Sequence, residues 1–372
     1  MTNIIASDSG SSTSLNTGDR LYVPGEVTLA VAGGVGIASA TSTTYGMEVF
    51  VDGTVVSLTG NAIVLQDEGT DFLGDNRLII GETGVVRSLN VPGNSAVYML
   101  GSGSHFDNAG EVSGQWGAFF QRWSEGVAIN SGRVSAIGES ALYFTDSSGV
   151  SLTNTGQLIS GDAGVEGQAA DFDRLLNTGE IIGGAEGYGV WIKTGDAGSL
   201  VVNRGLISGG EAAVQLSSQD DVLRNRGEID GDVRLGGGDD VYRGGKGAVD
   251  GRIDGQAGAD LLIGGRDDDL IFGGVGKDEI RGGRGDDIMQ GGGSADLFVV
   301  GRHGGDDVIR DLTHGKDHLD LSAFDLNWKP LKNNLMSDTK AGVLIDLEGH
   351  GGGTVLLRGA EIADFGKGDF IL

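Results

Sequence analysis

The sequence predicts an all-β protein in which a parallel β-helix solenoid continues into a parallel β-roll. Three observations lead to this fold class. Glycine provides 71 of the 372 residues, an Asn-x-Gly-x-aliphatic unit recurs through the N-terminal part, and a nine-residue repeat follows it. Glycines spread along the whole chain, with only 3 prolines, indicate short strands joined by tight turns. Helices are disfavoured because each interior glycine costs about 1 kcal/mol.

Residues 1–46 are expected to form an N-terminal cap or a degenerate first coil. The runs Leu21-Tyr-Val and Val27-Thr-Leu have the alternation and composition of strands. The register of these runs with the rest of the chain is not defined by the sequence.

Residues 47–234 are expected to form the parallel β-helix. The unit Asn-x-Gly-x-aliphatic begins at Asn108, Asn130, Asn154, Asn177, Asn203 and Asn225, at intervals of 22 to 26 residues, and weaker copies occur around Gly53, Gly84 and Gly251. Each unit holds three short apolar runs separated by glycines, which describes one coil of a stacked solenoid. Asparagines stacked at one corner can hydrogen-bond to one another as a ladder.

Residues 235–300 have a different period. The consensus Gly-Gly-x-Gly-x-Asp-x-aliphatic-x is repeated in the segments that begin at Leu235, Gly255, Gly264, Gly273, Gly282 and Gly291, with a degenerate copy at 302–310. Residues 244–254 interrupt the series, and Val249 stands there where the aspartate should be. An acidic linker would not keep its aspartates in register over six copies.

This nonapeptide has the chemistry of a Ca²⁺ site. Glycines reach backbone conformations closed to other residues and can turn carbonyl oxygens inward, and Ca²⁺ accepts six to eight such hard oxygen ligands. Every second aspartate should lie on the same side of the roll, about 4.8 Å from its stacked neighbour. The candidate calcium ligands in the repeats are Asp240, Gly258, Asp260, Gly265, Asp269, Gly274, Gly276, Asp278, Gly283, Gly285, Asp287, Gly292 and Asp296.

Calcium should also decide whether this segment folds. Adjacent carboxylates repel by roughly 3 kcal/mol per pair at an effective dielectric of 20, whereas each minimal strand buries only one or two aliphatic side chains. We therefore expect a disordered calcium-free segment that gains β structure at about 0.1–1 mM Ca²⁺.

Composition limits the partners and the compartment. The formal charge of −27 disfavours nucleic acid and anionic membranes and favours divalent cations. The chain has no cysteine, no apolar stretch long enough to span a bilayer, and no visible N-terminal secretion signal in MTNIIASDSGSSTS.

The nonapeptides resemble those of the RTX (haemolysin-type calcium-binding repeat) family of Gram-negative secreted proteins, which includes toxins, serralysin proteases, lipases, alginate epimerases and adhesins. Residues 301–372 are expected to form a C-terminal cap and secretion signal. The segment 296–324 is similar to the cap that follows the β-roll in serralysin-like and epimerase C-terminal regions, which implies that Asp307, Asp311, Asp317 and Asp320 join the terminal calcium sites. The ending Gly368-Asp-Phe-Ile-Leu resembles the family's export signal. The resemblance implies a type I exporter as partner and an extracellular or cell-surface location.

The function of the N-terminal part remains open between two classes. A non-enzymatic adhesin, matrix or surface-layer protein is favoured because the motifs of proteases and lipases, and the signature of alginate epimerases, are absent. The alternative is a polysaccharide lyase or C5-epimerase, for which Asp171, Asp173 and Arg174 are the nearest approach to a catalytic cluster. No catalytic residue is assigned. The aromatic group Trp116, Phe119, Phe120 and Trp123 suggests contact with an extracellular polysaccharide, although core packing explains at least half of it.

Overall fold

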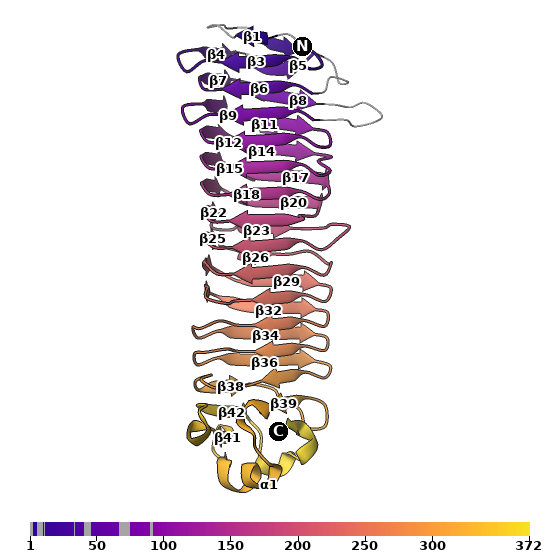
Figure 1. Ribbon diagram of the computed structural model, residues 1–372, viewed down its shortest axis with the longest axis vertical. Coiled ribbons are helices and arrows are strands. Elements are labelled where there is room, and N and C mark those ends of the chain that lie inside the picture. Colours follow the sequence, from indigo (N-terminus) through magenta and orange to yellow (C-terminus); the bar gives the residue numbers. More distant parts are fainter. Residues whose placement is uncertain are drawn as a thin grey trace. The chain divides into compact units, whose positions relative to one another are not determined.

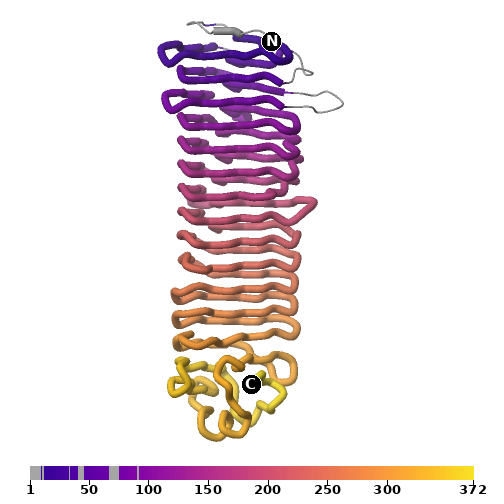
Figure 2. The backbone as a smooth tube through the Cα atoms, viewed as in Figure 1, coloured from indigo at the N-terminus to yellow at the C-terminus, as the bar shows by residue number. Residues whose placement is uncertain are grey.

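The structure is a computed structural model that describes residues 3–5, 10, 12–32, 34–40, 46–66, 75–89 and 92–372. Parts of the predicted N-terminal cap, at 1–2, 6–9, 11, 33 and 41–45, lie outside the described residues. The chain divides into two compact units, residues 1–216 and 217–372. Stacked parallel coils form both units, so the predicted fold class is confirmed (Figures 1 and 2). The predicted boundaries at 46, 234 and 300 stay predictions.

Unit 1 is a three-sided parallel β-helix whose sheets we call A, B and C. From β3 onward each coil gives one strand to each sheet in that order. Sheet A contains β1 (Asn3–Ile5), β3 (Arg20–Val23), β6 (Glu48–Val51), β9 (Arg77–Ile80), β12 (His105–Asn108), β15 (Val127–Asn130), β18 (Ser151–Asn154), β21 (Arg174–Asn177) and β24 (Leu200–Asn203). Sheet B contains β4 (Thr28–Val31), β7 (Thr54–Ser57), β10 (Val85–Ser88), β13 (Glu111–Gly114), β16 (Arg133–Ala136), β19 (Gln157–Ser160), β22 (Glu180–Ile182) and β25 (Leu206–Ser208). Sheet C contains β2 (Thr13–Leu15), β5 (Ile37–Ser39), β8 (Ile63–Gln66), β11 (Ser95–Leu100), β14 (Trp116–Gln121), β17 (Leu142–Ser147), β20 (Val165–Ala170), β23 (Tyr188–Ile192) and β26 (Ala212–Gln215).

Alternation along each strand explains the core of unit 1. In β15 the outer residues are partly exposed, while Ala128 and Asn130 are buried. The predicted strand runs at Leu21-Tyr-Val and Val27-Thr-Leu fall at β3 and β4. Half of the aromatic group is core: Phe120 and Trp123 are fully buried. Trp116 and Phe119 lie on the outer face of sheet C, so the expectation that packing explains at least half of the group is confirmed.

The asparagine ladder is confirmed at the corner between sheets A and B. The Nδ2 atom of each asparagine donates to the Oδ1 atom of the next, at 2.8–2.9 Å, in the series Asn108, Asn130, Asn154, Asn177 and Asn203. All five side chains are fully buried. Two residues after each asparagine stands a glycine. A Cβ there would approach a carbonyl oxygen of the preceding coil to 2.0–2.2 Å in the case of Gly132, Gly156, Gly179 and Gly205. The Asn-x-Gly spacing is therefore required by close stacking of the coils.

Unit 2 begins with three-sided coils and changes to two-sided coils, and its sheets are called D, E and F. Sheet D contains β27 (Val222–Asn225), β30 (Val241–Arg243), β33 (Leu261–Ile263), β35 (Glu279–Arg281), β37 (Leu297–Val299), β39 (His318–Asp320) and β43 (Phe370–Ile371). Sheet E has only β28 (Glu228–Asp230) and β31 (Ala248–Asp250). Sheet F contains β29 (Val233–Gly237), β32 (Arg252–Ala257), β34 (Leu270–Val275), β36 (Ile288–Gly293), β38 (Asp307–Ile309), β42 (Thr354–Arg358), β41 (Gly342–Asp346) and β40 (Met336–Asp338).

The interruption at 244–254 is explained by sheet E. Residues 244–254 supply β31, the last strand of sheet E. After this strand, each nonapeptide forms half of a two-sided coil. Gly247, whose added Cβ would lie 2.5 Å from Nδ2 of Asn225, occupies the glycine position of the ladder corner. The expected weak copy at Gly251 is wrong, because the following Arg252 and Ile253 begin β32 of sheet F.

The C-terminal cap follows the last nonapeptide. Its helical turns are η1 (Ser322–Phe324), α1 (Trp328–Pro330), η2 (Leu331–Leu335), η3 (Glu348–His350), η4 (Ile362–Asp364) and η5 (Lys367–Asp369). The segment predicted as an export signal ends in β43, which pairs with β39. Phe370 packs there against Trp328 and Phe365. Among the described residues, none of these short helices has the length and apolar composition of a membrane span.

Candidate metal centre

The repeat aspartates form two columns along unit 2. The first column comprises Asp240, Asp260, Asp278, Asp296 and Asp317, each directly before a strand of sheet D, and the second comprises Asp269, Asp287 and Asp307, at the starts of strands of sheet F. Consecutive nonapeptides alternate between the columns, so neighbours such as Asp260 and Asp278 are 18 residues apart. This confirms that every second aspartate lies on the same side.

In most of these carboxylates, one oxygen accepts a backbone N–H of the preceding coil. The Oδ1 atoms of Asp260, Asp278 and Asp296 accept the backbone N–H of the preceding aspartate in the column at 2.8–3.0 Å. In the second column, Asp287 and Asp307 accept in the same way at 2.9 and 3.1 Å. The columns are thus built into the backbone hydrogen bonding of the roll.

The second oxygen is left without a donor. Five Oδ2 atoms are buried and have no hydrogen-bond partner: those of Asp240, Asp260, Asp278, Asp287 and Asp296. A buried carboxylate oxygen with no partner is costly, and in native proteins it calls for a bound ion or water. Asp269 and Asp317 differ, since their Oδ2 atoms accept the backbone N–H of Gly265 and Thr313.

Burial makes the isolated negative charge unfavourable. It raises the pKa of Asp240 and Asp287 to about 8 and that of Asp278 to about 7, and neighbouring carboxylates add to the effect. The pKa of Asp260 and of Asp307 is raised to about 6 for the same main reason. A divalent cation among these groups would reverse the balance, because the ionised form then has a partner.

Glycines leave the space that each carboxylate occupies. A Cβ on Gly255, Gly273, Gly282 or Gly291, the first residue of its nonapeptide, would lie 2.1–2.4 Å from the Oδ2 atom of the aspartate five residues later. At the fourth position, Gly258 and Gly276 have φ of +142° and +150°, and a Cβ there would meet a carbonyl of the preceding coil. Gly274, Gly283, Gly285 and Gly292 also have positive φ, whereas Gly265 does not. Carboxylates and closely spaced carbonyls are the oxygen donors that Ca²⁺ uses, so the residues fit this ion.

The four aspartates suggested by the cap resemblance are in different surroundings. Asp307 and Asp317 belong to the columns. Asp311 accepts the N–H groups of Gly291 and Gly292 at 2.9 and 2.8 Å, so its carboxylate lies against the last nonapeptide. Asp320 accepts the N–H of Ser322 at the start of η1, in a local turn outside the columns.

Sequence analysis missed two features of the columns. Asp221 is buried and donates its backbone N–H to Oδ1 of Asp240, which extends the first column by one coil. The fifth-position aspartates also form an exposed ladder, in which the backbone N–H of Asp286 donates to Oδ1 of Asp268, and the backbone N–H of Asp306 to Oδ1 of Asp286, at 2.7–2.8 Å. The motif Asp-Asp-Val, shared by 220–222 and 239–241, could have revealed the first feature.

Other candidate sites do not assemble. Across the described ranges, no group of three His, Cys, Asp or Glu side chains could hold a metal by itself, so carbonyl oxygens are needed at any calcium site. In the candidate catalytic cluster of unit 1, Asp171 accepts the N–H of Gly149 in a turn.

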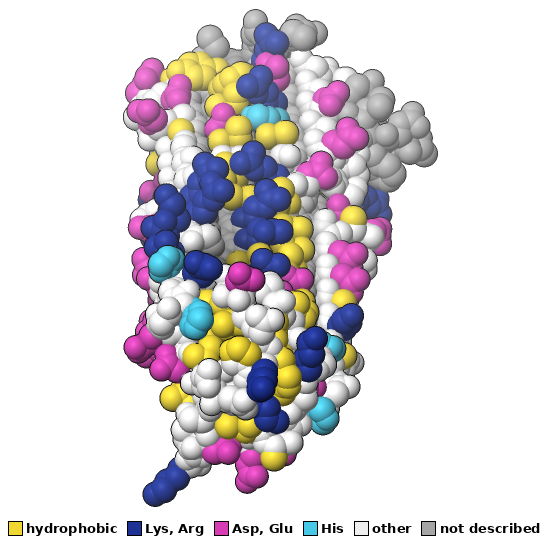
Figure 3. Space-filling model, turned by 60° about the horizontal axis from the view of Figure 1, so that its bottom comes forward, with side chains coloured by type: hydrophobic (Ala, Val, Ile, Leu, Met, Phe, Trp, Pro, Cys, Tyr) yellow, Lys and Arg dark blue, Asp and Glu magenta, His cyan; other side chains and the backbone are white. Residues whose placement is uncertain are grey.

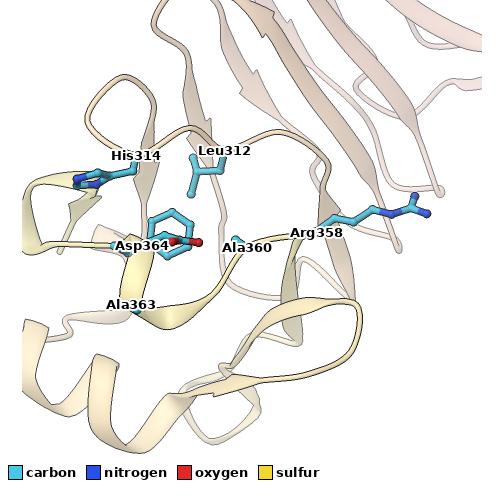
Figure 4. A pocket seen from close by; sticks show the side chains of 8 residues that line it. Leu312, His314, Arg358, Ala360, Ala363 and Asp364 are labelled. Carbon is cyan, nitrogen blue, oxygen red and sulfur yellow. The ribbon is translucent and has the colours of Figure 1, made fainter.

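In the cap, a hollow of about 530 Å³ is bordered by His314 and Arg358, but these side chains point away from each other (Figure 4). His314 instead contacts Asp369, Nδ1 to Oδ2, at 2.7 Å.

Comparison with known families agrees with this geometry. The model of the RTX calcium-binding nonapeptide repeat, which spans four copies, matches residues 250–280 and 272–302. No curated protein matches the chain. The matched segment contains Asp260, Asp278, Asp287 and Asp296, four of the five aspartates with an unpartnered buried oxygen. Residues 250–302 of the chain thus carry RTX calcium-binding nonapeptide repeats.

Proposed function

We propose that this is a secreted protein whose roll folds around several Ca²⁺ ions outside the cell. The observation that carries the proposal is the set of five buried Oδ2 atoms without a donor, in the columns of unit 2. Calcium supplies the positive charge that these oxygens need. The aspartates Asp240, Asp260, Asp278, Asp287 and Asp296 would hold it, together with carbonyl oxygens of the glycine turns.

Export by a type I secretion system is part of the proposal. The family's members typically leave the cell in this way, and a roll that depends on calcium would stay unfolded where calcium is scarce. The segment from Gly368 to Leu372 would act as the signal, and β43 forms from it in the folded cap.

We further propose a non-enzymatic adhesive or matrix role for unit 1, with extracellular polysaccharide as partner. Rings on the outer face of sheet C support it. The partly exposed rings of Tyr98 and Phe119 lie 5.4 Å apart, and Phe119 and Trp116 each lie 4.7 Å from the buried ring of Tyr143, between ring centroids. Two coils beyond Tyr143, Trp191 stacks on Tyr188 at 4.3 Å. Aromatic rows on an outer sheet face can stack on the apolar faces of sugar rings.

A calcium titration of the full-length chain tests the calcium proposal. Circular dichroism should show β structure increasing between about 0.1 and 1 mM Ca²⁺, and isothermal titration calorimetry should count several ions. The variant Asp278→Ala should bind fewer ions, while Asp196→Ala, an exposed site in unit 1, serves as the matched control. A spectrum and a heat signal that stay unchanged up to 10-fold above this range would refute the proposal.

A further inference from the structure

Three exposed arginines border a hollow on the outer side of sheet D. Arg224 and Arg226 lie at and just after the end of β27, and Arg243 ends β30. Together with Asn225, Gly245 and Ile263 they line a hollow of about 460 Å³. Figure 3 shows that Lys and Arg side chains gather in one group, although the chain has 53 acidic and only 26 basic residues.

None of the three arginines has a carboxylate partner among the described residues, whereas some other arginines of unit 2 do. Arg281, which follows in the same row of sheet D, pairs with Glu279. On sheet F, Arg252 pairs with Asp232, Oδ2 to Nε, at 3.2 Å. In the register of sheet D, Val222 on β27 and Val241 on β30 stand in the same row as Glu279 on β35. Around the hollow, this row of sheet D therefore lacks the carboxylate that pairs with Arg281.

The arrangement is unfavourable without a ligand. Arg224 and Arg243 are register partners on adjacent parallel strands, so their guanidinium groups start from backbones about 4.8 Å apart. Like charges directly opposite each other destabilise a sheet. The surplus carboxylates elsewhere compensate little, since charges more than about 8 Å away are screened at physiological ionic strength.

We propose that the hollow binds an acidic polysaccharide through its carboxylate groups. Guanidinium groups recognise carboxylates in a bidentate manner, and arginines on successive coils require a ligand whose charges repeat along the solenoid. The half-exposed side chains of Val222, Val241 and Leu261 form an apolar row beside the arginines, suited to the C–H faces of the sugar rings. The site lies outside the calcium columns and goes beyond calcium binding, and it rests on the proposed function only in needing unit 2 to be folded.

The test is a calorimetric titration of the full-length protein, in saturating calcium, with a hexamer of galacturonate. The hexamer should bind, and a neutral hexamer of galactose should not. The triple variant Arg224→Gln, Arg226→Gln, Arg243→Gln should weaken binding by at least about tenfold. The matched control Arg281→Gln should stay within about twofold, because that arginine already has a carboxylate partner. Binding to the wild type should weaken steeply with added salt.

Several outcomes would overturn the inference. Equal binding by the triple variant and the wild type would exclude the hollow, and equal binding of the neutral hexamer would exclude carboxylate recognition. Displacement of the uronate by equimolar inorganic phosphate would identify a phosphate site instead. Circular dichroism of the same samples separates the two proposals. If calcium folds the roll but galacturonate does not bind, only the arginine site is refuted. If calcium does not change the spectrum, the proposed function is refuted.

Discussion

The asparagine ladder of unit 1 and the aspartate columns of unit 2 differ in one atom per residue and have opposite requirements. Each asparagine amide both donates and accepts. Nδ2 of Asn130 donates a hydrogen bond to Oδ1 of Asn154, and Oδ1 of Asn130 accepts one from Nδ2 of Asn108. The carboxylate of each aspartate, when ionised, can only accept. Asp278 receives a backbone N–H on Oδ1, and its Oδ2 remains buried without a donor. The amide ladder is complete within the protein, whereas the carboxylate column needs a cation.

This difference teaches how a solenoid can be made independent of ligand or dependent on it. The same close stacking of coils, with glycines where a Cβ would collide, occurs at Gly156 and at Gly276. Stacked amides add a neutral hydrogen bond at each step. Stacked carboxylates about 4.8 Å apart repel by roughly 3 kcal/mol per pair at an effective dielectric of 20. We therefore expect folding of a coil with stacked carboxylates to depend on calcium, and folding of a coil with stacked amides to be independent of it.

Removal of calcium should have the largest effect and should separate the two regions. In EDTA, hydrogen–deuterium exchange of the full chain is expected to show loss of protection in residues 258–310, because the columns lose their counter-charge. Peptides from β15 to β21, which contain the asparagine ladder, should keep theirs. Equal protection of both regions with and without calcium would contradict the comparison.

The second test places a carboxylate in the amide ladder. In Asn154→Asp, the lost Nδ2 leaves a charged oxygen facing Oδ1 of Asn177 and the carbonyl oxygens of Gly156 and Glu180. An unpaired buried charge costs about 3–5 kcal/mol, so the melting temperature should fall markedly at pH 7 and recover in part at acidic pH. Calcium should not rescue it. The control Asn154→Ser keeps a neutral polar group, and a stability loss as large as that of the aspartate would show that charge is not the cause.

Much of this contrast could be predicted from sequence because it depends on spacing. The 22- to 26-residue interval of the asparagines predicted that they stack as a ladder at one corner. The nine-residue interval from Gly255 onward predicted that alternate aspartates lie on one side of the roll. Both patterns are confirmed. Such periods determine which side chains stack, since stacked coils have only one register that buries the apolar positions.

The features that sequence analysis missed depend on irregular or distant contacts. Residues 244–254 looked like a defect in the repeat, but they supply β31, because the number of sides per coil changes there. The hollow beside Arg224 and Arg243 could not be predicted, since these residues are 19 positions apart and meet only through the register of β27 and β30. The surroundings of Asp311 depend on the course of the cap, which has no repeat.

The third test makes the reverse substitution in the roll. Asp278→Asn is expected to weaken calcium binding by about tenfold or more, since a charge-assisted contact contributes roughly 1.5–3 kcal/mol. In EDTA the same variant should be more stable than the wild type, because the repulsive buried charge is gone. Calorimetry and thermal melts in the two conditions check both signs. The exposed Asp268→Asn lies outside the columns and is the control; a variant that loses stability in EDTA as well would argue that Asp278 has a purely structural role.

The smallest expected effect is a shift with pH, and its sign follows from the raised pKa values. Without calcium, the pKa of Asp240 and of Asp287 is about 8 in the folded roll, against about 3.9 in an unfolded chain. Between these values the folded state binds more protons, so the calcium-free roll loses stability as the pH rises from about 4 to 8. Calcium needs the ionised carboxylates, so protons compete with it. The calcium midpoint measured by circular dichroism should therefore rise several-fold between pH 7.5 and 5.5, while calcium-free β content increases. A midpoint that stays constant over this range would mean that the buried oxygens are not the groups that bind the ion.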